Sequence, residues 1–218
     1  MKTYLLIIAF LQKFFLTISI GIMLIFPLVL VFLPQDLSEQ TILNIYDISH
    51  VSIFLVMLIR PLADIFINTK WIRPLVQLRK GVGVFSASVV TSFIFSKIII
   101  DPAGYLGALG TTSYWSLTNF ALIAHLADIS AIILLVTSNK LSKRILGTWW
   151  KKIQKLSYVF FYASSLYVYL TFGHVTLLFS MAIITLVTIL AFIKNKKRLQ
   201  TKVVMTTPQP LHHNSLRI

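Results

Sequence analysis

The sequence predicts an all-α, polytopic membrane protein built as a bundle of six transmembrane helices. Of its 218 residues, 57% are hydrophobic and only 12% are charged, a balance typical of membrane proteins and not of water-soluble globules. Six apolar runs approach the roughly 20 residues that a helix needs to cross a bilayer. The basic residues gather between these runs, so the formal charge of +14 is best explained by topology.

The runs follow one another along the chain with clear interruptions. They cover residues 14–33, 48–62, 82–100, 117–136, 156–172 and 174–193. Pro34 ends the first run, and Asp101 with Pro102 ends the third. A turn at Gly173 separates the last two, and the glycine-rich segment 103–116 is expected to be a loop that meets an interface. Three regions result: an interfacial N-terminus (1–13), the six-helix domain (14–193) and a basic tail (194–218).

The distribution of Lys and Arg predicts the orientation in the membrane. Nearly all 20 of them lie before the first run, between the second and third, between the fourth and fifth, or after the sixth. The other three connectors contain none. Because cytoplasmic loops carry the excess of Lys and Arg, we expect a multi-pass protein of the cell membrane with both termini cytoplasmic. The lipid bilayer is then the partner of the apolar surface. Nucleic acid is not, since no basic helix is free to face a groove.

One connector and the helix after it carry a recognisable pattern. Thr137-Ser138 is followed by Arg144-x-Leu146-Gly147, then by Trp150, then by Leu156-x-Tyr158. Two weaker stretches precede it, Arg60-Pro61-Leu62-Ala63 and the segment 78–84. In this order the motifs resemble the ferric-reductase-like transmembrane domain family. Within it they are closest to the MsrQ-like haem-binding membrane subunits of periplasmic methionine sulfoxide reductase systems. The resemblance runs from about residue 42 to 197.

The resemblance implies a redox function. Members of the family hold haem b between helices with histidine ligands and pass electrons across the bilayer to an extracytoplasmic partner. The three ligand positions fall here on Phe93, Gln154 and Tyr167. Of these only Tyr is a haem ligand in some proteins, so a haem b would need other ligands. No glycine-rich phosphate loop for NADPH is present. The electron donor would therefore be a quinone or a cytoplasmic protein. A flavin is a further candidate cofactor.

Three histidines are candidate haem or metal ligands: His50, His125 and His174. The predicted topology places all three in the outer half of the bilayer, with His125 roughly 12 Å deep at the helical rise per residue. The alternative is that they are polar interface residues, because two of them lie at helix ends. His212 and His213 lie in the tail and are expected to be solvated. The absence of cysteine excludes thiolate metal sites.

His125 and Asp128 are spaced i, i+3 and share one face of the fourth helix. An ionised carboxylate near mid-membrane costs several kcal/mol, so Asp128 must be protonated, paired or facing water. One interpretation is a hydrogen bond to His125, or a pairing with Lys97, that stabilises packing. The other is a proton or quinone site. Arg60 is a second candidate for a quinone headgroup or flavin phosphate, and its alternative role is to anchor lipid headgroups beside Asp64.

Three functions remain open from the sequence. The first is a membrane redox subunit that passes electrons to an extracytoplasmic partner. The second is a haemless membrane scaffold or partner protein. The third is a small proton-coupled carrier that uses His125 and Asp128. Whether the chain is an enzyme is not decided by its residues.

Overall fold

The computed structural model describes residues 1–33, 38–117 and 120–206, which form helices joined by short turns, with no strand among them. The all-α prediction is therefore confirmed for this part of the chain. Asp36 and the tail histidines His212 and His213 lie outside the described residues. The elements are α1 (Lys2–Phe32), α2 (Glu39–Ile65), α3 (Ile72–Leu75), α4 (Leu78–Ile100), α5 (Pro102–Leu109), η1 (Thr112–Trp115), α6 (Ala121–Thr137), α7 (Lys140–Leu146), α8 (Thr148–Ile153), α9 (Leu156–Phe172) and α10 (Val175–Thr206).

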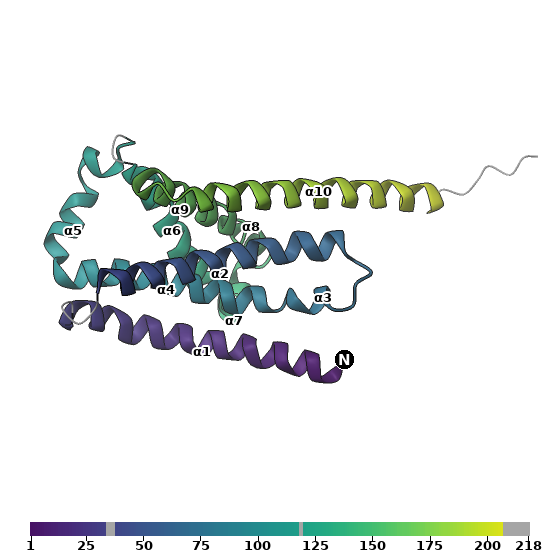
Figure 1. The fold of residues 1–218 in the computed structure, drawn as a ribbon, viewed down its shortest axis with the longest axis horizontal. Helices are drawn as coiled ribbons and strands as arrows, with labels where there is room; N and C mark the ends of the chain where they lie inside the picture. Colours follow the sequence, from purple (N-terminus) through teal and green to yellow (C-terminus); the bar gives the residue numbers. More distant parts are fainter. Residues whose placement is uncertain (34–37, 118–119, 207–218) are drawn as a thin grey trace, which may run out of the picture.

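The long helices lie side by side with α4 in the middle of the bundle. Helix α4 contacts α1, α2 and α6, while α2 also contacts α9 and α10, and α6 packs against α9. Figure 1 shows α1 and α10 along opposite sides. The N-terminus, the α2–α3 connector and the C-terminal part of α10 lie at one end, which we call the basic end. Helix α5 crosses the other end, which we call the far end.

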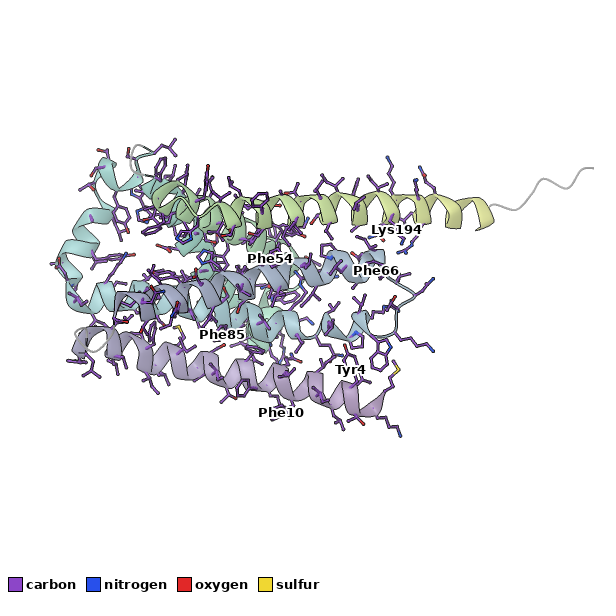
Figure 2. All side chains as sticks on the ribbon, viewed as in Figure 1. Tyr4, Phe10, Phe54, Phe66, Phe85 and Lys194 are labelled. Atoms are coloured by element: carbon purple, nitrogen blue, oxygen red, sulfur yellow. The ribbon has the colours of Figure 1, made fainter. Side chains whose placement is uncertain are left out.

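The bundle is apolar outside and rich in small hydroxyl side chains inside. Phe10 on α1 is 67% exposed and Phe192 on α10 is 69% exposed. Figure 2 shows Phe10 pointing away from the other helices. Buried positions in contrast hold many polar residues: Ser19, Ser49, Ser52, Ser86, Ser88, Thr91, Ser92, Ser96, Ser130, Thr137 and Ser165. A water-soluble protein has the opposite distribution, so this surface is suited to lipid and this interior to close helix packing.

Hydrogen bonds between helices use these hydroxyls. Ser49 Oγ and Ser86 Oγ are 3.0 Å apart, and Ser86 Oγ also donates to Ser49 O at 3.0 Å. Ser92 Oγ lies 3.3 Å from Ile22 O on α1 and 2.7 Å from Ser88 O in its own helix. Such pairs need small residues that bring the backbones together. They fix α4 between α1 and α2.

Four helices are long and apolar enough to cross a membrane: α1, α2, the α3–α4 segment and α10. A fifth span is obtained if α6 and α7, which are bent by 95°, are taken together. The chain is thus a membrane protein with four or five candidate spans, and the predicted count of six is not confirmed by length and composition. Helix α9 has the predicted bounds 156–172, but it contains only 17 residues, as does α6.

Four segments differ clearly from their predicted extent. Helix α2 runs from Glu39 to Ile65 and so begins well before the predicted run 48–62. Helix α1 is continuous from Lys2, so no break separates residues 1–13 from the first span. Helix α10 continues to Thr206, through Lys194 and Arg198, into the predicted tail. The predicted loop 103–116 is wrong, because it contains α5 and η1. Pro102 occupies the first turn of α5, where proline is favourable, and Asp101 Oδ1 accepts a hydrogen bond from Gly104 N at 2.8 Å.

The connector from α6 to α9 folds into two short helices around Gly147. Its φ of 51° and ψ of −119° are accessible to glycine and strained for other residues. This backbone reverses the chain between α7 and α8. Trp150 Nε1 then donates to Thr137 O at the end of α6, at 2.9 Å. Gly147 and Trp150 of the motif thus have structural roles, since Gly147 allows the backbone conformation between α7 and α8 and Trp150 ties the connector to α6.

Replacing Trp150 with phenylalanine should lower the free energy of unfolding by about 1 kcal/mol, because it deletes this hydrogen bond and keeps most of the ring. Thermal melting of the detergent-purified protein would then fall by roughly 2–4 °C. Trp149→Phe is the matched control. Trp149 is 63% exposed and stacks only with the Lys152 ammonium, 4.2 Å from its ring centre. Equal melting shifts for the two variants would contradict the role of Trp150.

Candidate functional site

The structure gives the three candidate histidines separate surroundings. His50 Nδ1 lies 2.9 Å from Tyr46 O, one turn earlier in α2. His125 stacks on Tyr114, with ring centres 3.7 Å apart and planes 12° apart, and meets the edge of Trp115. His174 is exposed between α9 and α10, near the Phe172 ring. Within the described ranges, no three His, Cys, Asp or Glu side chains are placed to hold a metal ion. The three histidines are thus not brought together as one metal site.

Asp128 belongs to a group of polar side chains that come from five elements. It is half-buried on α6, one turn after His125. It lies within electrostatic range of Lys97 on α4, of Tyr46 on α2 and of Tyr114 in η1. Tyr167 on α9 is in turn within range of Tyr46. We call this group the polar centre; its members are Tyr46, Lys97, Tyr114, His125, Asp128 and Tyr167.

Two buried ring nitrogens beside the polar centre have no hydrogen-bond partner among the described residues. They are His125 Nε2 and His50 Nε2. Buried polar atoms are nearly always satisfied by protein, ordered water or ligand. His50 Nδ1 faces Tyr46 O and so carries the hydrogen, which leaves His50 Nε2 as a hydrogen-bond acceptor. Both nitrogens are thus positions where a water molecule or a ligand could complete the hydrogen bonding.

Tyr114 covers the polar centre from the far end. Burial raises the pKa of its phenol well above the ordinary value, and a hydrogen bond to Tyr105 and the charge of Asp128 add to the effect. The phenol therefore stays neutral and remains a hydrogen-bond donor at physiological pH. Together with Trp115 it places an aromatic layer over His125.

The positions of the family's haem ligands do not fit haem b in this chain. Phe93 has no donor atom, and its ring is stacked on Tyr46 with centres 4.2 Å apart. Phe26 approaches the same ring edge-on at 5.3 Å. Aromatic packing thus occupies the surroundings of Phe93. Gln154 ends α8, where its Nε2 lies 3.4 Å from Thr137 Oγ1. Only Tyr167 could ligate iron, and an axial pair needs a facing ligand.

Arg60 does not belong to the polar centre. It lies 14 residues after Tyr46 on α2, which is roughly 21 Å along the helix. Its guanidinium Nε is 4.0 Å from Asp64 Oδ2 at the basic end. There it lines a pocket of about 450 Å³ between the end of α2 and the segment from α3 to Gln77. The structure thus separates the proton candidates His125 and Asp128 from the headgroup candidate Arg60.

Some residues of these sites were not singled out from the sequence. Tyr46 could have been found, because it precedes His50 by four residues and therefore shares its helix face. Tyr114 lies in the segment 103–116, which the sequence predicts only as a loop that meets an interface. Arg73 and Gln77, which line the pocket with Arg60, carried no signal of their own beyond the basic connector.

Comparison with protein-family models, with curated proteins and with solved structures gives no match for this chain. The resemblance to the ferric-reductase-like family therefore stays a prediction that depends on the motif residues alone.

Proposed function

We propose that the chain crosses the cell membrane six times, with both termini in the cytoplasm. The short helices α6 and α9 would be the fourth and fifth spans. Seventeen residues extend roughly 26 Å, slightly less than a typical hydrocarbon core of about 30 Å. The basic connectors α7 and α8 would then lie at the cytoplasmic headgroups, and α5 with η1 at the outer surface. This arrangement follows the positive-inside rule.

We infer that the protein is a proton-coupled membrane protein, and that Asp128 is the group that binds and releases the proton. The observation that carries this proposal is the position of Asp128. It is a half-buried carboxyl in a helix of a membrane protein, within electrostatic range of Lys97, Tyr46 and Tyr114. Ionisable side chains inside membranes are costly and mark proton or ion pathways. If this position served helix packing alone, a hydroxyl or amide side chain would fill it at a lower desolvation cost.

The neighbours of Asp128 suggest how the proton reaches it. His125 lies one turn nearer the start of α6 and has a buried, unpartnered Nε2. It can take a proton at the far end, below the Tyr114 and Trp115 rings, and pass it towards the Asp128 carboxyl through one water molecule. Lys97 stabilises the carboxylate after the proton leaves. Tyr46 provides a hydroxyl within electrostatic range of the same carboxyl.

The proposal can be tested with the purified full-length chain in liposomes that contain a trapped pH-sensitive dye. A potential imposed with potassium and valinomycin should drive proton movement faster than in protein-free liposomes. Varying the lipid-to-protein ratio should change the rate in proportion to the protein. Rates that do not differ from those of empty liposomes, for imposed potentials of both signs, would contradict a proton pathway.

A second candidate is a redox subunit that exchanges electrons and protons with a quinone and serves an extracytoplasmic partner. The observation that favours it is a series of aromatic ring contacts. Tyr46 stacks on Phe93, and Phe93 contacts Phe26, which lines an apolar groove between α1, α2 and α4. The groove has a volume of about 160 Å³ and is lined by Ile22, Phe26, Ile45, Ile48, Phe85 and Val89. The groove suits an isoprenoid tail, and the polar centre would exchange protons with the quinone headgroup.

Two measurements separate this candidate from the first. Organic extraction of the protein, purified in mild detergent, should recover quinone in stoichiometric amount. Absorption spectra of protein from haem-supplied cells, oxidised and then reduced with dithionite, test for haem. A b-type band that disappears on substitution of His50 or His125 would assign haem to these histidines. A protein with neither quinone, haem nor proton movement would be a membrane scaffold.

A further inference from the structure

A polar pocket lies at the basic end, away from the polar centre. It has a volume of about 450 Å³ and is formed by the last turns of α2 with Ile67 on one side, and by α3 with the two residues that follow it on the other. Its polar lining consists of Arg60, Asp64, Arg73 and Gln77. Its apolar lining consists of Ala63, Ile67 and Val76. It thus combines hydrogen-bond donors with a hydrocarbon wall.

The pocket has an excess of positive charge. Arg60 and Asp64 form an ion pair at 4.0 Å, which leaves the Arg73 guanidinium as the excess positive charge of the lining. Gln77 adds an amide donor. Arg79 lies behind the pocket, where its Nε donates to Val56 O at 3.0 Å. Guanidinium groups bind phosphate oxygens with paired, directional hydrogen bonds.

Two further cations stabilise the helix end that forms one wall. Lys194 Nζ donates to Ile65 O at 2.6 Å, and Arg198 Nη1 donates to Asp64 O at 2.7 Å. Figure 2 shows Lys194 of α10 above Phe66 at the end of α2. These bonds satisfy carbonyls that a helix C-terminus leaves unpaired and offset its partial negative charge. The end of α2 beside Arg60 is therefore held in place, and because its partial negative charge is offset, it does not repel an anion strongly.

The aromatic residues around the pocket indicate that it lies at a membrane interface. Trp71, just before α3, is 59% exposed, and its backbone oxygen accepts a hydrogen bond from the Tyr4 hydroxyl at 2.7 Å. The two rings meet edge to face, 5.0 Å apart. Exposed Trp and Tyr beside Arg and Lys are typical of the level of lipid headgroups.

We propose that this pocket binds the phosphate of an anionic phospholipid, with Arg60, Arg73 and Gln77 on the phosphate oxygens and Ile67 and Val76 against the glycerol and upper acyl chain. The mixed lining favours a lipid over a soluble phosphate compound, because a soluble phosphate would make no use of the apolar wall. Basic pockets between helices on the cytoplasmic side of membranes bind such headgroups. The proposal does not depend on the proton function, since the two sites lie at opposite ends of α2.

The test uses the full chain, purified and delipidated in a neutral detergent. Its melting temperature should rise with added phosphatidylglycerol and saturate, because a ligand that binds only the folded state stabilises it. Phosphatidylcholine should give little change. Inorganic phosphate at the same concentration should also give little change. Stabilisation by inorganic phosphate equal to that by phosphatidylglycerol would overturn the lipid assignment and leave a site for soluble phosphates.

Variants locate the site. Arg60→Gln with Arg73→Gln should weaken binding of a fluorescent-tailed phosphatidylglycerol at least tenfold, measured by anisotropy well below the melting temperature. Arg73→Gln alone removes an exposed side chain and should weaken binding without affecting folding. Arg144→Gln, an exposed arginine on α7, is the matched control and should bind as the wild type does. Unchanged binding in the double variant, or an equal loss in the Arg144 control, would overturn the proposal.

Discussion

Replacing Asp128 with asparagine should reduce proton movement through the reconstituted protein by roughly a hundredfold, the effect typical of losing a positioned proton-transfer group. The amide has nearly the same shape and keeps two hydrogen-bonding atoms, but it does not bind and release a proton in the accessible pH range. Folding should not suffer. Removing a half-buried charge from a membrane helix avoids its desolvation cost, so the melting temperature should stay the same or rise.

Asp47→Asn is the matched control for this prediction. Asp47 lies on α2, one residue after Tyr46, but it is exposed. The substitution therefore removes one negative charge from the same half of the bundle without touching the polar centre. The Asp47 variant should move protons at the wild-type rate. His125→Gln should give a smaller loss than Asp128→Asn, since water can replace a relay group. Normal rates in the Asp128 variant would reject the proton function and leave its carboxyl as a packing residue.

The sequence predicted the helical membrane class well, because apolar runs and basic connectors are local signals. It gave the bounds of α9 correctly. It missed the start of α1 and the end of α10, because apolarity marks where lipid contact ends and not where the helix ends. Lys, Arg, Leu and Gln are good helix formers, so α10 continues through its charged residues 194–200. The start of α5 was missed as well. Asp101 caps this helix, but the glycines of the segment 103–116 predicted a loop.

The candidate site was predicted only in part. The i, i+3 spacing placed His125 and Asp128 on one face of α6, and Lys97 was named as a partner for Asp128 because it is the one cation in the third apolar run. Tyr46 comes from α2, and no spacing along the chain predicts that it lies within electrostatic range of Asp128. The pocket at the basic end could not be predicted for the same reason. Arg60 and Arg73 are separated by a connector whose path only the structure shows.

Replacing Gly81 with valine should have the largest effect on stability, a loss of about 3 kcal/mol in the free energy of unfolding. A Cβ at Gly81 would lie 2.9 Å from Gln12 O and 3.2 Å from Phe15 Cβ. Neither contact can be relieved by rotating a flexible side chain, so α1 must move away from α4. The melting temperature in detergent should fall by roughly 6–12 °C. Gly21→Val is the matched control, because nothing lies within 4 Å of a Cβ there.

Gly81→Val should also disturb the polar centre, because it displaces α1. Helix α1 supplies Phe26, whose ring contacts Phe93, and Phe93 holds Tyr46 in its stack. If α1 is displaced, this stack loses one side and Tyr46 is no longer fixed near Asp128. Gly81→Val should therefore slow proton movement even at temperatures where the protein stays folded, whereas Gly21→Val should not. A folded Gly81 variant with wild-type rates would mean that Tyr46 is not needed for proton transfer, and that His125 and Lys97 suffice beside Asp128.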